Sequence, residues 1–350
     1  MAVRLHWTED LRRHFHIPAA HPVAAPSAVA FLAGVLLAGA FLTCGASANG
    51  QPVSAAPVEA APAAAPAVVA PSVAAQSVAT AQSVATLTND EAQALVKRVL
   101  AVELEAAQNG PIDHPMQYHL RKTSPRYSSA KLIIETRDGD VARLLEVNGA
   151  PLSPESEQNE AARLQALLDD PSLQHHRQER EQGDAERARK IIHALPDAFL
   201  YQYSGIVDTP HGPSYRLSFQ PNPKFDPEDL EAQALKGMAG ELWIDVAQKR
   251  VTRLEGKRIH DVDYGWGILG KLDEGGTLLL EQADVGEGQW RTTHMVLVMN
   301  ARLLVKTIKL DTTLELSDYV PVQSGISYKD AIKILRKNDP PAQPPAAAKH

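Results

Sequence analysis

Apolar residues begin to recur at helical spacing after Thr88, and the folded part of the chain is expected to begin there. Thr88 and Glu91 fit a capping box, in which a hydroxyl and a carboxylate each satisfy a free N–H group of the first helical turn. The pattern runs to Asn109-Gly110-Pro111 and predicts an amphipathic helix before that point. Its apolar positions are Leu95, Val96, Val99, Leu100, Val102 and Leu104.

Strand patterns follow this helix, and a helical segment comes after them. Residues 116–123, 130–137 and 141–147 are predicted strands, and Asp138-Gly139-Asp140 between the last two is a strong hairpin signal. Ser153-Pro154 and Asp170-Pro171 each place a capping residue before a first-turn proline, so two helices are predicted. Residues 174–190 are almost all polar and predict a solvated helix.

From Phe199 onward the pattern is that of long antiparallel strands separated by turns. Leu242 and Ile244 share one face of their strand, and Glu241 and Trp243 share the other. Residues 289–299 become apolar on both faces near their end, so a second layer must cover the sheet, and the early helices are expected to do so. The predicted strands are 199–207, 215–220, 240–246, 250–259, 262–272, 277–285, 289–298 and 303–316.

Two low-complexity segments flank this region and define the expected domain organisation. Residues 49–87 are mostly Ala, Pro, Val, Ser and Gln, which favours a disordered tether because few large apolar side chains are present. The tail 339–350 has the same character. We therefore expect one α+β domain over residues 88–338, with a helical insert at about 153–195.

The first 48 residues have the form of an export signal. Arg12 and Arg13 precede the uncharged run 28–44, and Ala46-Ser47-Ala48 offers a signal peptidase site. Retention of this run as a membrane anchor is an alternative, because 17 apolar residues lie at the lower limit for crossing a bilayer. Lipid attachment at Cys44 is a third possible fate of this segment. Each of them predicts a periplasmic or secreted domain, tethered to the membrane in the last two cases.

Charge and cysteine content narrow the function classes. The 350 residues carry 35 basic and 42 acidic side chains, for a net charge of −7, without a cluster of the basic residues that nucleic acid requires. Nucleic acid is therefore not an expected partner. Cys44 is the single cysteine, which excludes an internal disulfide and a cysteine-based zinc site.

No catalytic or cofactor motif stands out in the sequence. The nucleophile elbow of acyl hydrolases, the zinc-protease helix and the phosphate-binding loop are all absent. His175 and His176 point about 100° apart on a helix and cannot share a metal ion by themselves. We therefore expect no catalytic residue, no cofactor and no metal. A hydrolase with a site assembled from dispersed residues remains an alternative.

One pair of strand segments resembles a known family. Residues 240–245 (GELWID) and 250–255 (RVTRLE) are similar to paired strands of periplasmic proteins in the outer-membrane lipoprotein-sorting superfamily. This resemblance implies an unclosed β-barrel, a curved antiparallel sheet with helices covering its concave face, around an apolar cavity for acyl chains. It implies no functional residue, because the shared positions are structural.

Together these observations predict a non-catalytic binding protein of the cell envelope for an apolar or lipidated ligand, such as a lipid, an acyl chain or a lipoprotein. Trp243, Trp266, Trp290 and Met295 are the expected lining residues of its cavity. The alternative is a structural module that docks an envelope protein partner and has no ligand cavity. A buried volume large enough for an acyl chain distinguishes the two.

Overall fold

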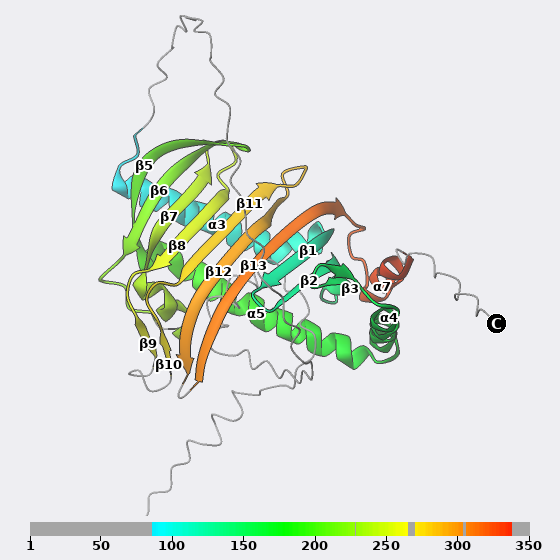
Figure 1. Cartoon of the computed structure of the whole chain (residues 1–350). Helices are drawn as coiled ribbons and strands as arrows, with labels where there is room; N and C mark the ends of the chain where they lie inside the picture. The colour runs from blue at the N-terminus through cyan, green and yellow to red at the C-terminus, as the bar shows by residue number, and fades with distance from the viewer. Residues whose placement is uncertain (1–85, 228, 265–269, 304–305, 338–350) are drawn as a thin grey trace, which may run out of the picture. The chain divides into compact units, whose positions relative to one another are not determined.

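The computed structural model describes residues 86–227, 229–264, 270–303 and 306–337, which form an α+β fold (Figure 1). The export segment, most of the tether, Trp266 and the C-terminal tail lie outside the described residues. The helices are α3 (Asn89–Asp113), α4 (Pro154–Asp169), α5 (Pro171–Ala198), α6 (Leu230–Gln233), the 3-10 turn η1 (Ala234–Gly237) and α7 (Tyr328–Lys337).

A single antiparallel sheet runs through the described residues, in the order β4-β3-β2-β1-β13-β12-β11-β8-β7-β6-β5. The sheet is open because β4 and β5 stand at opposite ends of this path, as the half-barrel prediction required. Its N-terminal strands are β1 (Met116–Ser124), β2 (Tyr127–Ile134), β3 (Val141–Val147) and β4 (Ala150–Pro151). The later strands are β5 (Phe199–Thr209), β6 (Gly212–Pro221), β7 (Met238–Asp245), β8 (Val251–Arg258), β9 (Val262–Tyr264), β10 (Gly270–Leu272), β11 (Thr277–Asp284), β12 (Trp290–Leu303) and β13 (Lys306–Pro321).

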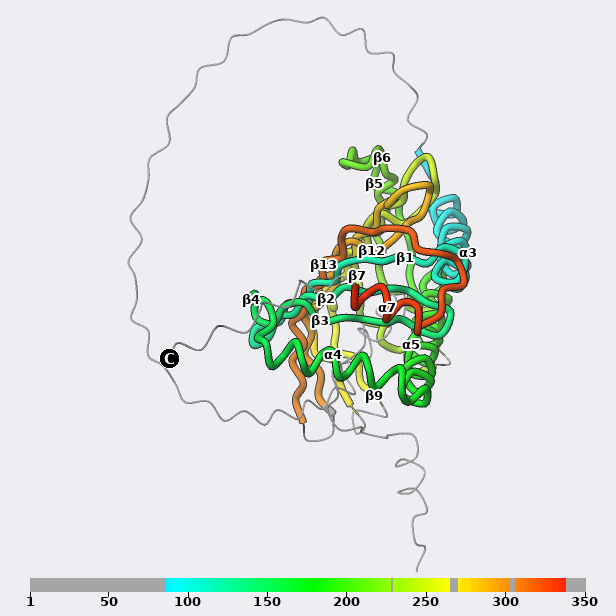
Figure 2. Tube along the Cα trace, turned by 90° about the vertical axis from the view of Figure 1, so that its right-hand side faces the viewer, coloured from blue at the N-terminus to red at the C-terminus, as the bar shows by residue number. Residues whose placement is uncertain are grey.

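Helices α3 and α5 cover one face of this sheet (Figures 1 and 2). The capping box at the start of α3 is present as predicted: Glu91 N–H donates to the Thr88 hydroxyl at 3.2 Å, and Thr88 N–H donates to the Glu91 carboxylate at 2.8 Å. The buried side chains of α3 and α5 join the inward residues of the strands in one large apolar core. This side of the sheet is called the inner face below.

The β2–β3 end of the sheet carries a second, smaller core on its other face. Ile133 points into the main core, while its neighbours Leu132 and Ile134 point into the second one, as the twofold alternation of a strand requires. Helices α4 and α7 cover this second core. Helix α7 was not predicted from the sequence, although Ala331, Ile332 and Leu335 are fully buried in it.

Four sequence predictions differ from the structure. Helix α3 continues past the predicted end to Asp113 and includes Pro111 in its last turn. The predicted strand 262–272 is instead the pair β9 and β10, joined in antiparallel register. Helix α5 is not solvated throughout, since Gln174 and Arg177 are buried against the β2–β3 turn. The outer face of β12 is not covered by helices, and Val298 there is 41% exposed.

Candidate functional site

A narrow cleft lies between the inner face of the sheet and helices α3 and α5. Its volume is about 60 Å³, enough for roughly two water molecules at the share each occupies in the liquid. Most of its walls are apolar, and they come from both helices and from strands far apart in the sequence. The lining residues are Leu100, Glu103, Ile192, Leu195, Tyr201, Leu242, Val251, Leu254, Leu280, Gln282 and Thr292.

A second cleft of about 50 Å³ adjoins the first under the C-terminal half of α3. The two clefts share Glu103, Gln282 and Thr292, so they are two ends of one space. We call the first the apolar end and the second the polar end. The polar end is further lined by Ala106, Ala107, Pro111, Tyr118, Glu135, Arg250, Trp290, Arg291 and Tyr319.

An ion pair joins α3 to the sheet where the two ends meet. The Arg250 guanidinium donates to both carboxylate oxygens of Glu103, at 2.8 and 2.9 Å, and the N–H group of Val251 also donates to Glu103 at 2.9 Å. The Arg250 guanidinium also lies 5.9 Å from the centre of the Trp290 ring. The side chains of Arg250 and Glu103 are largely buried, at 12% and 11% exposure. Each therefore needs the other to compensate its charge.

Glu135 and Arg291 are the other two charged groups of the polar end. Glu135 is 4% exposed, and one of its oxygens accepts the Met116 N–H at 3.0 Å. Burial raises the pKa of this carboxyl, while the nearby Arg291 and the Met116 N–H oppose that shift. The Arg291 guanidinium donates to the carbonyls of Trp290 and His114 at 3.1 and 3.0 Å. Tyr118 and Tyr319 stack beside them with ring centres 5.0 Å apart.

The predicted lining residues that the structure describes lie in three different surroundings. Trp290 does line the polar end, where its indole N–H donates to Gln248 at 2.8 Å. Met295 is buried in the main core but lines neither end of the cleft. Trp243 lies on the opposite face of β7 from Leu242, donates to Glu241 at 3.1 Å and packs under Arg253. It therefore faces away from the cleft. Trp266 is outside the described residues.

Sequence reasoning missed the charged residues of the polar end. Glu103, Glu135, Arg250 and Arg291 are spread over 188 positions, and only the strand order brings them together. One signal was present: Glu103 interrupts the apolar run of α3 between Val102 and Leu104. On the outer face, the His294 ring pairs with Glu281 at 3.1 Å.

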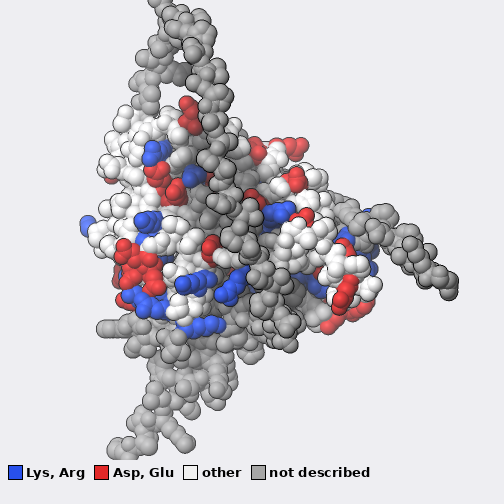
Figure 3. Space-filling model, in the orientation of Figure 1, with Lys and Arg blue, Asp and Glu red and all other residues white. Residues whose placement is uncertain are grey.

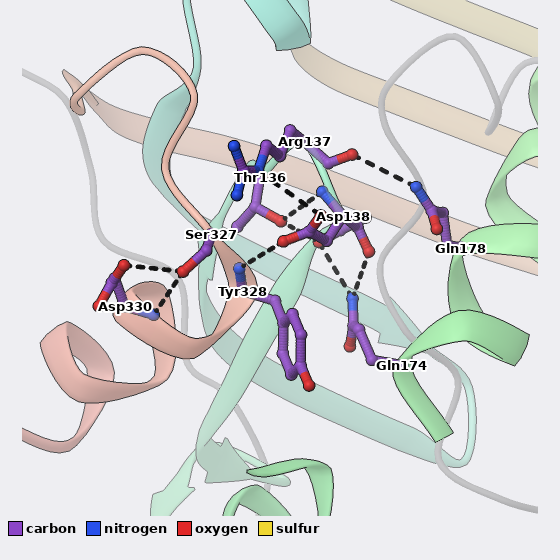
Figure 4. Close-up of polar contacts among 9 residues, drawn as sticks. Thr136, Arg137, Asp138, Gln174, Gln178, Ser327, Tyr328 and Asp330 are labelled. Atoms are coloured by element: carbon purple, nitrogen blue, oxygen red, sulfur yellow. Dashed lines mark hydrogen bonds and ion pairs between the residues drawn. The ribbon is translucent and has the colours of Figure 1, made fainter. Parts of the chain in front are cut away.

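A second polar cluster lies where the β2–β3 turn meets α5 and α7 (Figure 4). Gln174 donates to the carbonyls of Asp138 and Gly139, and Asp138 accepts the N–H group of Tyr328 at the start of α7. Below the turn, the Asp140 N–H donates to the Glu181 carboxylate at 2.9 Å. These contacts dock two helices on one hairpin.

Acidic and basic side chains are interspersed on the outer face of the sheet, as Figure 3 shows. Arg216 pairs with Glu241 and Arg253 with Glu255 and Glu281, so charges along neighbouring strands compensate one another. Among the described residues, no helix is long and apolar enough to cross a membrane, and no group of three or more His, Cys, Asp and Glu side chains is suited to a metal ion.

No protein-family model matches the chain, and no curated protein sequence does. Solved structures with a similar fold include a lipoprotein-sorting protein domain from Vibrio parahaemolyticus, with 13% identity and a TM-score of 0.27, covering 72% of this chain and all of the other. A LolA superfamily protein from Nitrosomonas europaea has 12% identity and a TM-score of 0.26, over 63% of this chain and 92% of the other. A DUF1329 family protein from Desulfovibrio piger has 12% identity and a TM-score of 0.25, over 67% and 95%.

Proposed function

We propose that this domain binds an apolar chain, such as the acyl chain of a lipid or lipidated protein, between its sheet and helix α3, without catalysis. The observation that carries the proposal is the shared cleft, which is apolar at one end and polar at the other. Small-molecule sites combine such walls: apolar area supplies affinity, and a few polar groups fix orientation. A cell-envelope location, as the N-terminal segment predicts, is where such ligands occur.

The described conformation is a closed one under this proposal. A cleft of about 60 Å³ is well below the roughly 300 Å³ at which ligand pockets begin, so an acyl chain requires the walls to separate. Helix α3 is the wall that can move, because it is tied to the strands through side chains and not through a hydrogen-bonded ladder. The Glu103–Arg250 pair and the contact of Arg291 with the His114 carbonyl hold its C-terminal half.

Apolar burial gives a rough expectation for the affinity. Each buried methylene contributes about 0.8 kcal/mol before the costs of association and of moving α3 are subtracted. We therefore expect saturable binding of fatty acyl probes with dissociation constants on the order of micromolar, tightening with chain length. Displacement of an apolar fluorophore measures this directly.

Leu280 and Leu279 supply a matched pair of variants for the test. Leu280 lines the apolar end, and its neighbour Leu279 points to the outer face. Leu280→Trp should fill the cleft and weaken probe binding by about tenfold or more, while Leu279→Trp should leave it unchanged. Thermal melting monitors folding of both variants. If native protein shows no saturable binding, or if both variants weaken it equally, the proposed site is wrong.

The alternative of an interaction module remains a specific rival because the cleft is small. Such a module requires a filled core with no ligand. A core whose cleft has a volume of only about 60 Å³ is nearly filled. The two proposals differ in their response to probes: a module with a filled core should not bind acyl chains saturably at any chain length. The same titration therefore decides between them.

A further inference from the structure

Two of the four charged groups at the polar end already satisfy each other. Glu103 accepts two hydrogen bonds from the Arg250 fork and one from the Val251 N–H, so three of its roughly four acceptor positions are used. The remaining pair is Glu135 and Arg291. No direct ion pair joins these two within the described part of the chain, although the charge of Arg291 acts on the pKa of Glu135.

Each of these two groups has hydrogen-bonding capacity left over. One carboxylate oxygen of Glu135, Oε2, accepts the hydrogen bond from the Met116 N–H group. The Nε–H group of Arg291 is buried and has no partner. Both residues line the same cleft of about 50 Å³. An acceptor and a donor therefore belong to two different lining residues of this cleft, and the donor is buried in the closed conformation.

We infer that the polar end holds a neutral head group that carries both a hydrogen-bond donor and an acceptor, as the amide of an N-acyl chain does. The N–H of the ligand donates to Glu135, and its carbonyl oxygen accepts from the Nε–H of Arg291. This inference rests on the proposed function, because the chain attached to the head group occupies the apolar end.

An anionic head group fits the same place poorly. A free fatty acid would bring a carboxylate beside Glu103 and Glu135, both of which are buried carboxyls. Arg250 is already committed to Glu103, and the charge of Arg291 already acts on Glu135, so a ligand carboxylate would be a third buried anion for two cations, which is costly. A head group with an acceptor alone would leave Glu135 without a donor. The contacts of the polar end therefore predict different affinities for three head groups on the same acyl chain: one with a donor and an acceptor, one with an acceptor alone, and an anion.

Three probes with the same acyl chain test the inferred preference for a neutral head group with a donor and an acceptor. N-methyldecanamide has the N–H donor, N,N-dimethyldecanamide lacks it and differs by one methyl group, and decanoate is an anion. One hydrogen bond to a charged group is worth about 1.5–3 kcal/mol, or roughly tenfold or more in affinity. Native protein at pH 8 should bind N-methyldecanamide about tenfold more tightly than either of the other two, as measured by displacement of an apolar fluorophore.

Glu135→Gln is the matching variant. Its amide oxygen can still accept from Met116, and its NH₂ group then faces the cleft and offers a donor in place of an acceptor. The preference of N-methyldecanamide over the dimethyl amide should disappear. The control is Glu146→Gln, which changes a carboxylate that pairs with Arg121 outside the cleft and should keep the preference.

The outcomes separate this inference from the proposed function. If all three probes bind with equal affinity and Leu280→Trp weakens all of them, the site exists and the head-group inference is wrong. Tighter binding of decanoate would also overturn it. If none of the probes binds, the proposed function fails and the inference fails with it.

Discussion

Gly240 shows how one residue fixes the packing of the sheet. It opens the segment that resembles the lipoprotein-sorting superfamily, and it lies opposite Gly256 in the β7–β8 pair. A Cβ atom on Gly240 would come within 1.9 Å of the Glu255 carbonyl oxygen, which belongs to the neighbouring backbone. Only glycine allows the two strands to approach this closely. The next residues then alternate, with Leu242 in the core and Trp243 on the outer face.

Gly240→Ala should destabilise the domain strongly, because backbone atoms of β8 have to shift to admit the new methyl group. We expect a loss of about 2 kcal/mol or more in the free energy of unfolding, measured by urea denaturation. Gly183→Ala is the control. That glycine is inside α5 with nothing closer than the Arg187 guanidinium at 3.7 Å, so alanine should stabilise it by up to about 1 kcal/mol. A neutral result at Gly240 would contradict the register of β7 and β8.

At the scale of elements, α5 is held to the β2–β3 turn by a buried polar cluster that includes two carboxyls. Burial raises the pKa of Glu181 to about 7, and it also raises the pKa of Asp140, where the neighbouring Glu181 adds to the effect. Arg177 opposes both shifts, and Arg180 and Asp184 also act on Glu181. Asp140 Oδ2 and Glu181 Oε1 are buried without hydrogen-bond partners. A proton on either carboxyl would give this cluster the donor that it lacks.

The stability of the domain should therefore depend on pH through Glu181. Its folded-state pKa of about 7 lies above its unfolded value, so the protonated form is favoured by folding. Protonated Glu181 therefore stabilises the folded domain. This stabilisation is fully present below about pH 4.5 and is lost as the pH rises to about 7, and the free energy of unfolding changes by an amount on the order of 2 kcal/mol. Urea denaturation between pH 5 and 8 measures it.

Glu181→Gln should flatten this profile, because glutamine keeps an acceptor for the Asp140 N–H and supplies a donor at every pH. The control variant, Glu179→Gln, removes an exposed carboxyl of the same helix whose pKa is lowered by its hydrogen bond to His176, and it should retain the native profile between pH 5 and 8. A native profile that persists in Glu181→Gln would assign the pH dependence to Asp140 or to another group.

At the scale of the whole molecule, the order of strands makes the cleft. The pairing of β1 with β13 brings the first predicted strand beside the last, so that Tyr118 and Tyr319 stack and Glu135 comes near Arg291. Helix α5 then crosses the inner face, with Gln174 at the β2–β3 turn and Leu195 at the apolar end of the cleft. The two polar clusters and the cleft therefore belong to one continuous packing unit.

Residues 49–85 of the tether predicted for residues 49–87 should contribute nothing to the stability of this unit. Deleting these residues should leave the melting temperature unchanged within about 2 °C, because the segment has few large apolar side chains with which to form a packed contact. Leu87 is kept in the deletion, since it packs against the main core. A larger fall in the melting temperature would show that the segment packs against the domain.

Local pattern determined the elements of this protein. The capping box of α3, the proline caps of α4 and α5, the Asp138-Gly139 turn and the alternation along β7 each arise from neighbours in the chain, so the sequence predicts them directly. The open sheet with helices on its concave face also agrees with the expected class. The caps, the turn and the alternation depend on interactions across only a few positions.

Only the tertiary structure decided which side chains meet. Trp243 and Trp290 look alike in their strands, yet one packs under Arg253 on the outer face and the other lines the cleft. Gln174 and Arg177 lie in the most polar stretch of α5, yet both are buried, because the carbonyls of the β2–β3 turn need donors that this face of the helix supplies. Glu135 and Arg291 are brought to one cleft by the β1–β13 pairing. The partners of Gln174 and Arg177 lie more than 30 positions away, as Glu135 does from Arg291, and a pattern of near neighbours carries no information about such contacts.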